Sequence, residues 1–249
     1  MEVSKRREIQ TAEASKDEWR THHKPFGPEW GSAYWGKWQT ISYALYELGL
    51  THGATILDVG MGTGWTTVFL AESGFAPTGV DIAPASVEVG RRRARRYSAQ
   101  ADFVTADMDV LDLDHAFDAV LVFDALHHST RQAQVVAGVA RHVAPGGWVL
   151  FGEPSWLHTL SPRARQTSRS LGWVERGIRV RKLKSDCSAA GLGSFRRFYE
   201  GTAPHAGGIT SFAFQSMRLL ASRFASAPQM SVWLAAQRPN ASHSDHTVR

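Results

Sequence analysis

Short apolar runs alternate with amphipathic stretches through the middle of the chain. Strand-like runs cover residues 54–59, 77–81, 101–105, 117–123 and 148–151, and helix-like stretches cover residues 65–73, 84–97 and 131–142. Strands that alternate with helices at this spacing form a parallel sheet with helices on both faces. We therefore predict an α/β fold built on a doubly wound, mostly parallel sheet.

The pattern is looser toward both ends of the chain. Residues 1–24 are polar and weakly periodic, which predicts either a mobile tail or a short lid helix. A helix is expected at 40–48. The predicted fold is completed by a later helix at 181–190 and by strands at 194–199 and 230–236. The expected division is a tail and aromatic lid at 1–40, one domain at 41–238 with helical acceptor-binding insertions at 155–180 and 201–228 that cover the site, and a disordered tail at 239–249.

Composition narrows the class of protein. Hydrophobic residues make up 43% of the 249 positions and charged residues 20%, which is typical of a soluble globular protein. The single cysteine, Cys187, excludes an internal disulfide framework. No apolar run reaches the roughly 20 residues of a membrane span, and residues 1–10 lack the apolar core of a signal peptide. We therefore expect a cytoplasmic protein.

The formal net charge of +5 raises the question of an anionic partner. Much of the excess lies in the run Arg91-Arg92-Arg93-Ala94-Arg95-Arg96 on a predicted helix. We interpret this run as a solvated helix face, and a patch that follows nucleic-acid phosphates is the alternative.

The stretch ILDVGMGTGW, residues 56–65, ends the first strand in a glycine-rich turn. A phosphate-binding Walker loop needs a Gly-Lys-Ser/Thr sequence, which this turn lacks. A dinucleotide fingerprint needs a small third residue, and Trp65 stands there. Asp81 follows Gly60 by 21 residues at the end of the second strand, where an acid suits a ribose diol. The turn is therefore expected to bind a nucleoside without a pyrophosphate, and Asp58 is placed to meet a cationic amino group.

Five motifs occur in order along the chain. They are ILDVGMGTG at 56–64, GVDIAP at 79–84, Ala106-Asp107-Met108, FDAVLVFDALHH at 117–128 and Ala144-Pro145-Gly146-Gly147 before the fifth strand. Together they resemble the motifs of the class I S-adenosylmethionine (SAM)-dependent methyltransferases. The resemblance covers residues 54–151, with weaker support to residue 236. It implies a seven-stranded sheet whose last strand is antiparallel, and SAM as the cofactor.

The same resemblance implies which residues bind the cofactor. These are Asp58, Gly60, Met61, Gly62, Gly64, Asp81, Ile82, Asp107, Met108 and Phe123. Within this set, Asp107 corresponds to the acid that reaches the adenine amine.

Methyl transfer to a hydroxyl group needs orientation, exclusion of water and a base. His127 and His128 follow the fourth strand and are candidates because histidine titrates near neutral pH, with Asp124 as an orienting or acceptor-binding group. A purely structural histidine is the competing interpretation. Asp124, His127, His128 and Glu153 also have the ligand types of a divalent metal site, but their spacing matches no known motif, so no metal is predicted.

The acceptor is expected to be a small molecule with a hydroxyl group, such as a secondary metabolite, a sugar or a quinone-like compound. Candidate acceptor-binding residues are Tyr34, Trp35, Glu153, Trp156 and His205. The competing functions are methylation of RNA, which would use the arginine-rich surface, and SAM binding without methyl transfer. An NAD-linked oxidoreductase is disfavoured by Trp65.

Overall fold

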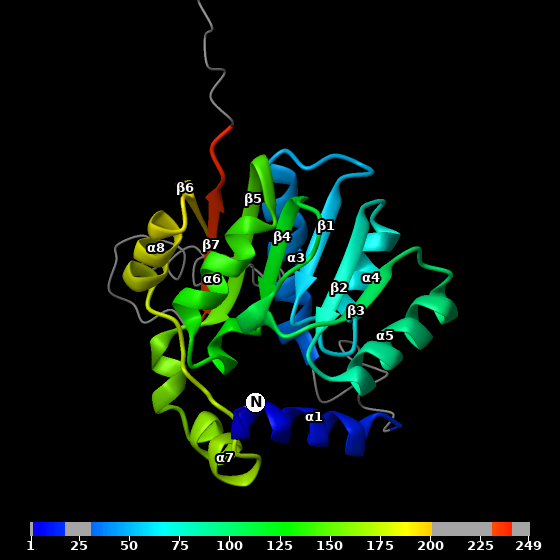
Figure 1. The fold of residues 1–249 in the computed structure, drawn as a ribbon, viewed down its shortest axis with the longest axis vertical. Helices are drawn as coiled ribbons and strands as arrows, with labels where there is room; N and C mark the ends of the chain where they lie inside the picture. The colour runs from blue at the N-terminus through cyan, green and yellow to red at the C-terminus, as the bar shows by residue number, and fades with distance from the viewer. Residues whose placement is uncertain (1, 18–30, 201–230, 241–249) are drawn as a thin grey trace, which may run out of the picture.

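The computed structural model describes residues 2–17, 31–200 and 231–240. Within these residues, seven strands form one sheet in the order β3-β2-β1-β4-β5-β7-β6 (Figure 1). The strands are β1 Thr55–Val59, β2 Ala76–Asp81, β3 Asp102–Thr105, β4 Phe117–Phe123, β5 Val143–Pro154, β6 Gly193–Phe198 and β7 Ser231–Gln237. Strands β1 to β5 pair in parallel, and β7 runs antiparallel to both β5 and β6. The predicted doubly wound sheet with an antiparallel last strand is confirmed.

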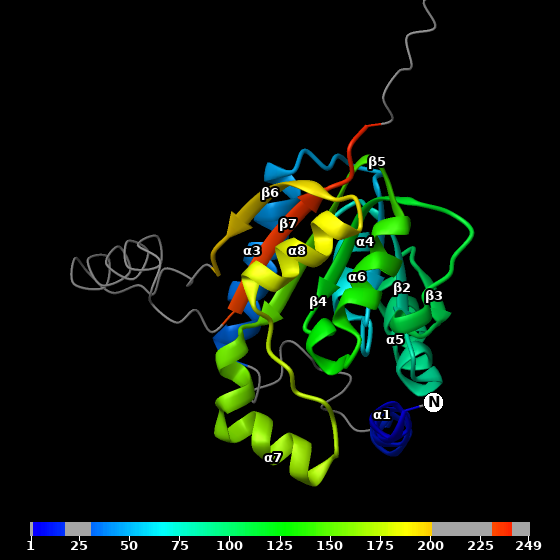
Figure 2. The same cartoon turned by 60° about the vertical axis from the view of Figure 1, so that its left-hand side comes forward.

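Helices cover both faces of this sheet (Figures 1 and 2). They are α1 Val3–Ser15, α3 Gly31–Glu47, α4 Trp65–Glu72, α5 Pro84–Tyr97, α6 Gln132–Arg141, α7 Pro162–Ser170 and α8 Val180–Ala189, with 3-10 turns η1 Met108–Val110, η2 Leu126–His128 and η3 Trp156–Leu160. Buried side chains of α3 and α4 share one core cluster, and those of α6 and α8 share another on the opposite face. Within the described part of the chain, no helix has both the length and the apolar character that a membrane crossing needs.

The central strands are buried on both faces, which explains their nearly continuous apolar sequence. In β1, Leu57 and Val59 face the cluster of α6 and α8, whereas Ile56 faces α3 and α4. In β4, Val120 and Leu121 divide between the faces in the same way. Since alternate residues of a strand point to opposite faces, only a strand with helices on both sides buries them all.

The starts of two elements differ from the prediction by about five residues or more. Helix α3 begins at Gly31 rather than at residue 40, so the aromatic segment joins the helix that packs on the sheet. Strand β5 begins at Val143 and runs through the predicted Pro-Gly-Gly turn. Its pairing with β4 shifts register between Phe117 and Ala119, and Gly146 has a φ of 78°, so the turn residues are absorbed as an irregularity at the start of the strand.

The polar N-terminal segment is a helix in its described part, which agrees with the lid-helix alternative. Helix α1 lies at the end of the molecule that also carries α7, below the sheet in both views (Figures 1 and 2). It packs beside α5, and Ser4 accepts a hydrogen bond from the backbone N–H of Val174, 3.1 Å away. Contacts with distant segments therefore hold a helix whose own sequence is weakly amphipathic.

Candidate functional site

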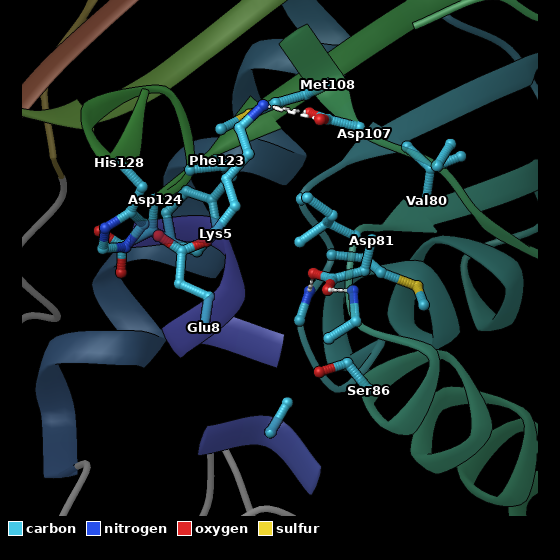
Figure 3. Close-up of a pocket in the computed structure, with 18 of the residues that line it drawn as sticks. Lys5, Glu8, Val80, Asp81, Ser86, Asp107, Met108, Phe123, Asp124 and His128 are labelled. Atoms are coloured by element: carbon cyan, nitrogen blue, oxygen red, sulfur yellow. Dashed lines mark hydrogen bonds and ion pairs between the residues drawn. The ribbon is translucent and has the colours of Figure 1, made fainter. Parts of the chain in front are cut away.

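A cavity of about 300 Å³ opens at the carboxyl ends of β1, β2 and β4. This is the position at which doubly wound sheets place their ligands. The lining comes from α1, the turn after β1, the ends of β2 and β4, the loop after β3, His128 and Trp173. Figure 3 shows Lys5 and Glu8 of α1 reaching across this space toward the strand ends. Segments that are far apart in the sequence thus form one cavity.

The predicted cofactor residues divide into two groups. Gly60, Met61, Gly62, Asp81, Ile82, Asp107, Met108 and Phe123 line the cavity, whereas Asp58 and Gly64 do not. Asp58 is 1% exposed and accepts hydrogen bonds from the hydroxyls of Thr66 and Thr67. Burial raises the pKa of Asp58 to about 6 against the opposing effect of these hydrogen bonds. Its carboxylate ties β1 to α4, and the expected contact with an amino group, directly or through water, stays a prediction.

The glycine turn needs glycine for close approach as well as for backbone conformation. Gly60 and Gly64 both have a φ of 71°, a region that favours glycine. A Cβ on Gly60 would lie 2.5 Å from the Cβ of Ala125, and one on Gly64 would lie 2.9 Å from the Cα of Gly90. The turn therefore packs directly against the loop after β4 and against α5, so any side chain here would push these segments apart.

Asp81 is held by the backbone of its own neighbourhood. One carboxylate oxygen accepts a hydrogen bond from the N–H of Gly62 and the other from that of Ala83, both at 2.9 Å. Burial raises the pKa of Asp81 to about 6, and these two hydrogen bonds limit the rise. The arrangement orients a carboxylate beside the cavity and leaves lone pairs for further donors.

Asp107 is held by a residue from the other end of the sequence. Lys5 of α1 lies 2.7 Å from both carboxylate oxygens of Asp107 and 2.6 Å from a carboxylate oxygen of Asp109. Burial alone would lower the pKa of Lys5, but the hydrogen bonds and charges of the two aspartates outweigh it and raise the pKa. This ion pair docks α1 over the adenine end of the predicted cofactor site.

Sequence reasoning missed the contribution of α1 to the cavity wall. Lys5, Glu8, Thr11, Ala12 and Ser15 all line the cavity. Their spacing of three and four residues places them on one helix face, and this signal was present in the sequence. Hydrophobic periodicity did not reveal this face, because its polar and small residues differ little in hydrophobicity from the rest of the helix.

The end of β4 brings Asp124 to the cavity. Asp124 has a φ of 54°, unusual for a residue other than glycine, and its N–H donates to the carbonyl of Gly152 at 2.9 Å. The ammonium of Lys37 lies 3.5 Å from its carboxylate. The backbone thus turns sharply here, so that the following loop crosses the carboxyl ends of β4 and β5.

His127 and Glu153 are buried behind the cavity wall rather than exposed in it. One oxygen of Glu153 accepts from the backbone N–H groups of Ala125 and Leu126, and the other lies 2.8 Å from Nδ1 of His127. Burial alone would lower the pKa of His127, but the hydrogen bond and charge of Glu153 outweigh it and raise the pKa. Glu153 therefore holds the loop after β4 and orients His127, and neither side chain is part of the cavity lining.

His128 does line the cavity. Its Nδ1 lies 2.9 Å from the carbonyl oxygen of Val174, and its ring meets Trp173 edge to face at 5.5 Å. A carbonyl oxygen only accepts hydrogen bonds, so Nδ1 carries the proton and Nε2 is left as the unprotonated nitrogen. Burial, together with the charge of His127, lowers the pKa of His128. The geometry therefore provides a neutral imidazole with a free acceptor at the cavity wall.

The predicted acceptor residues are more scattered. Tyr34 is buried and packs edge to face on Trp65, with ring centroids 5.7 Å apart. Trp35 and Trp156 are about half exposed and do not line the cavity. His205 lies outside the described residues. Trp173, which the sequence did not single out, lines the cavity instead.

The side chains of the arginine run in α5 are not uniformly exposed to solvent. Arg93 is buried, with 6% of its surface exposed. Arg91 donates to the carbonyl of Phe103, and Arg92 donates to that of Lys16. Only part of this run is therefore available to an anionic partner.

Comparison with known proteins agrees with the fold. Residues 56–147 match the family described as "Methyltransferase domain". A solved structure of phosphoethanolamine N-methyltransferase 2 from Haemonchus contortus, in complex with SAM, superposes with a TM-score of 0.68 at 16% identity over 96% of this chain and 61% of that one. Residues 56–147 therefore match a methyltransferase domain in sequence, and the fold is that of the SAM-dependent methyltransferases.

Two curated relatives are similar to part of the sequence. A demethylmenaquinone methyltransferase of Tropheryma whipplei is 35% identical over 106 residues, which are 43% of this chain and 44% of the relative. A ubiquinone biosynthesis O-methyltransferase of Paramagnetospirillum magneticum is 31% identical over 132 residues, which are 50% of this chain and 51% of the relative. The chain thus spans about half the length of these relatives.

Proposed function

We propose that this protein transfers the methyl group of SAM to a hydroxyl oxygen of a small molecule, and that the acceptor is a quinone-like phenol. The observation that carries the proposal is one cavity with a ribose-type carboxylate, Asp81, and a neutral imidazole, His128, in its walls. The names of the two curated relatives, both of which concern quinones, support the choice of acceptor.

The cofactor is placed by the residues around the glycine turn. In our proposal, Asp81 accepts from the ribose hydroxyls, and Ile82 and Met108 contact the two faces of the adenine ring. Asp107 accepts from the adenine amine, and Gly60 lets the methionine part pass close to the backbone. All five residues lie in the cavity lining, so one ligand can reach them together.

The transfer itself is an in-line displacement. A lone pair of the acceptor oxygen attacks the methyl carbon, and the carbon–sulfur bond breaks with its electrons remaining on sulfur. The hydroxyl proton passes to Nε2 of His128, the nitrogen left unprotonated by the contact of Nδ1 with Val174. Asp124 and Trp173 lie beside this position and orient the acceptor. His127, fixed by Glu153, positions the loop that carries His128.

The first experiment is calorimetric titration of the purified protein with SAM, S-adenosylhomocysteine and NAD. We expect the first two to bind and NAD not to bind. Asp81→Asn should weaken SAM binding by about 10- to 100-fold, because its amide cannot accept both ribose hydroxyls. Unchanged affinity in Asp81→Asn would contradict the placement of the cofactor.

The second experiment measures labelled methyl transfer to catechols, hydroquinones, sugars and RNA. His128→Gln should leave SAM affinity within about twofold of the wild type and lower kcat by about 100-fold or more. His115→Gln, at an exposed position, is the matched control. Transfer to RNA in preference to phenols would support the competing function, and SAM binding without transfer to any acceptor would contradict the proposal.

A further inference from the structure

Three potential ligand atoms converge beside the loop that follows β4. They belong to His127, His158 and Glu175, and all three atoms lie within 4.8 Å of one another. A carboxylate oxygen of Glu175 lies 2.7 Å from Nε2 of His158 and 3.7 Å from Nε2 of His127. Among the described residues, this is the group of His, Cys, Asp or Glu side chains that could together hold a metal ion. It shares only His127 with the four metal-ligand candidates that the sequence suggested.

We propose that His127, His158 and Glu175 bind a divalent transition-metal ion, with Zn²⁺ as the best match. Two imidazole nitrogens and one carboxylate oxygen suit zinc better than magnesium or calcium, which prefer oxygen ligands. Ligands about 2.1 Å from a tetrahedral ion lie roughly 3.4 Å from one another. The observed separations are close enough to reach this geometry with small side-chain movements.

The surroundings of His127 support a metal ligand rather than a hydrogen-bonding residue alone. Nδ1 of His127 is engaged by Glu153 at 2.8 Å, so Nε2 is the nitrogen that faces His158 and Glu175. A carboxylate on the far nitrogen of a histidine is the usual partner of a metal-bound imidazole, because it fixes the ring and increases its basicity. The exposed surface of His127 is only 4%, which would protect the bound ion from competing water.

The three ligands come from three separate segments. His127 lies in η2, His158 in η3, and Glu175 in the stretch between α7 and α8. The last two segments are also joined where the N–H of Trp156 donates to the carbonyl of Ile178. A bound ion would therefore clamp the cover of residues 156–178 onto the loop after β4. It would sit behind His128, whose ring centroid is 4.0 Å from that of His127, and would leave the methyl-transfer cavity free.

The test is titration of the untagged, chelator-treated full chain with Zn²⁺, and with Co²⁺ followed by visible absorption. We expect one site with a dissociation constant in the micromolar range or below, and d–d bands of four- or five-coordinate Co²⁺. His158→Ala and Glu175→Gln should each weaken Zn²⁺ binding by about 10- to 100-fold or more. His115→Ala removes an exposed histidine that also pairs with a carboxylate, and it should bind Zn²⁺ as the wild type does.

Folding is monitored separately by circular dichroism of each variant in chelator. If a variant loses its structure, Glu175→Asp shortens the ligand while it keeps the charge, and it should show intermediate affinity. Absence of Zn²⁺ binding below millimolar concentration would overturn the proposal. So would binding that both variants leave unchanged, because the ion would then lie elsewhere in the chain. Neither result depends on SAM binding or methyl transfer, so this site can fail while the proposed function stands.

Discussion

Two walls of the cavity hold similar carboxylates in very different ways. Asp81, at the end of β2, is held by the backbone N–H groups of Gly62 and Ala83, which are local to the strand ends. Asp107, after β3, accepts from the local N–H of Asp109 but is also held by Lys5, 102 positions away in the sequence. The first wall consists of the sheet's own turns, whereas the second combines a local turn with the docking of one helix. The strand-end wall is therefore expected to be rigid, and the α1 wall is expected to open locally.

The strand-end wall should be the more sensitive to added volume. Gly60→Ala places a Cβ 2.5 Å from Ala125 at a positive φ, and we expect it to lower the free energy of unfolding by about 3–4 kcal/mol. Gly62→Ala is the matched control: its φ is 56° but no atom lies within 4 Å, so about 1–2 kcal/mol is expected. Denaturant unfolding measures both values. Equal losses would show that close packing of the turn does not matter.

The carboxylate of the strand-end wall should make cofactor affinity depend on pH. The pKa of Asp81 is raised to about 6, first of all by burial, and ribose hydroxyls bind its ionised form. Affinity for S-adenosylhomocysteine should be constant above that pH and fall by up to about tenfold for each pH unit below it. Titrations from pH 5 to 7.5 check this expectation. Asp81→Asn should remove this fall, and a fall of the same size in that variant would assign it to another group.

Loosening the α1 wall should leave the rest of the fold intact. Lys5→Met removes the ion pairs with Asp107 and Asp109, and we expect amide hydrogen exchange in residues 3–15 to rise about fivefold. Lys182→Met breaks an exposed pair with Asp186 and serves as a control of equal charge change. Exchange in β1 and β4 should not change in either variant. Faster exchange in these strands would show that the two walls open together.

The smallest expected effect concerns Glu8, which faces Asp81, Ser4, Lys5 and His127. Burial and the charge of Asp81 raise its pKa from 4.5 to about 7. Docked α1 therefore binds more protons than released α1 between these values, so docking weakens as the pH rises through that window.

We expect the protection of residues 3–15 to fall by about threefold between pH 6.5 and 7.5, after correction for intrinsic exchange. Glu8→Gln should remove this dependence. If the variant keeps it, the titrating group lies elsewhere on the α1 wall.

Local patterns were sufficient to predict the centre of the fold. The helix predicted at residues 84–97 is α5, because Pro84 suits a first helical turn and the apolar positions recur on one face. The glycine turn was also predictable, because positions with a positive φ are usually occupied by glycine. The start of β5 was not predictable from local sequence. A Pro-Gly-Gly sequence favours a turn, and here its residues join the strand because neighbouring strands pair with them.

The residues of the candidate site also divide into those that local sequence predicted correctly and those that it did not. Asp81 and His128 were placed by their positions at the ends of predicted strands and Met108 by the family resemblance, and all three line the cavity. Glu153 was also placed after a strand, yet it points at backbone N–H groups, because its environment depends on the path of the next loop.

The sequence by itself determined the doubly wound sheet, the nucleoside-type turn and the order of the carboxylates along it. These features depend on residue periodicity and backbone conformation, which act over a few positions. Only the tertiary structure decided that α1 closes the cavity, that Trp173 lies beside His128, and that His158 and Glu175 meet His127. Such contacts join residues tens to more than a hundred positions apart, and their energy appears only after the sheet has brought the segments together.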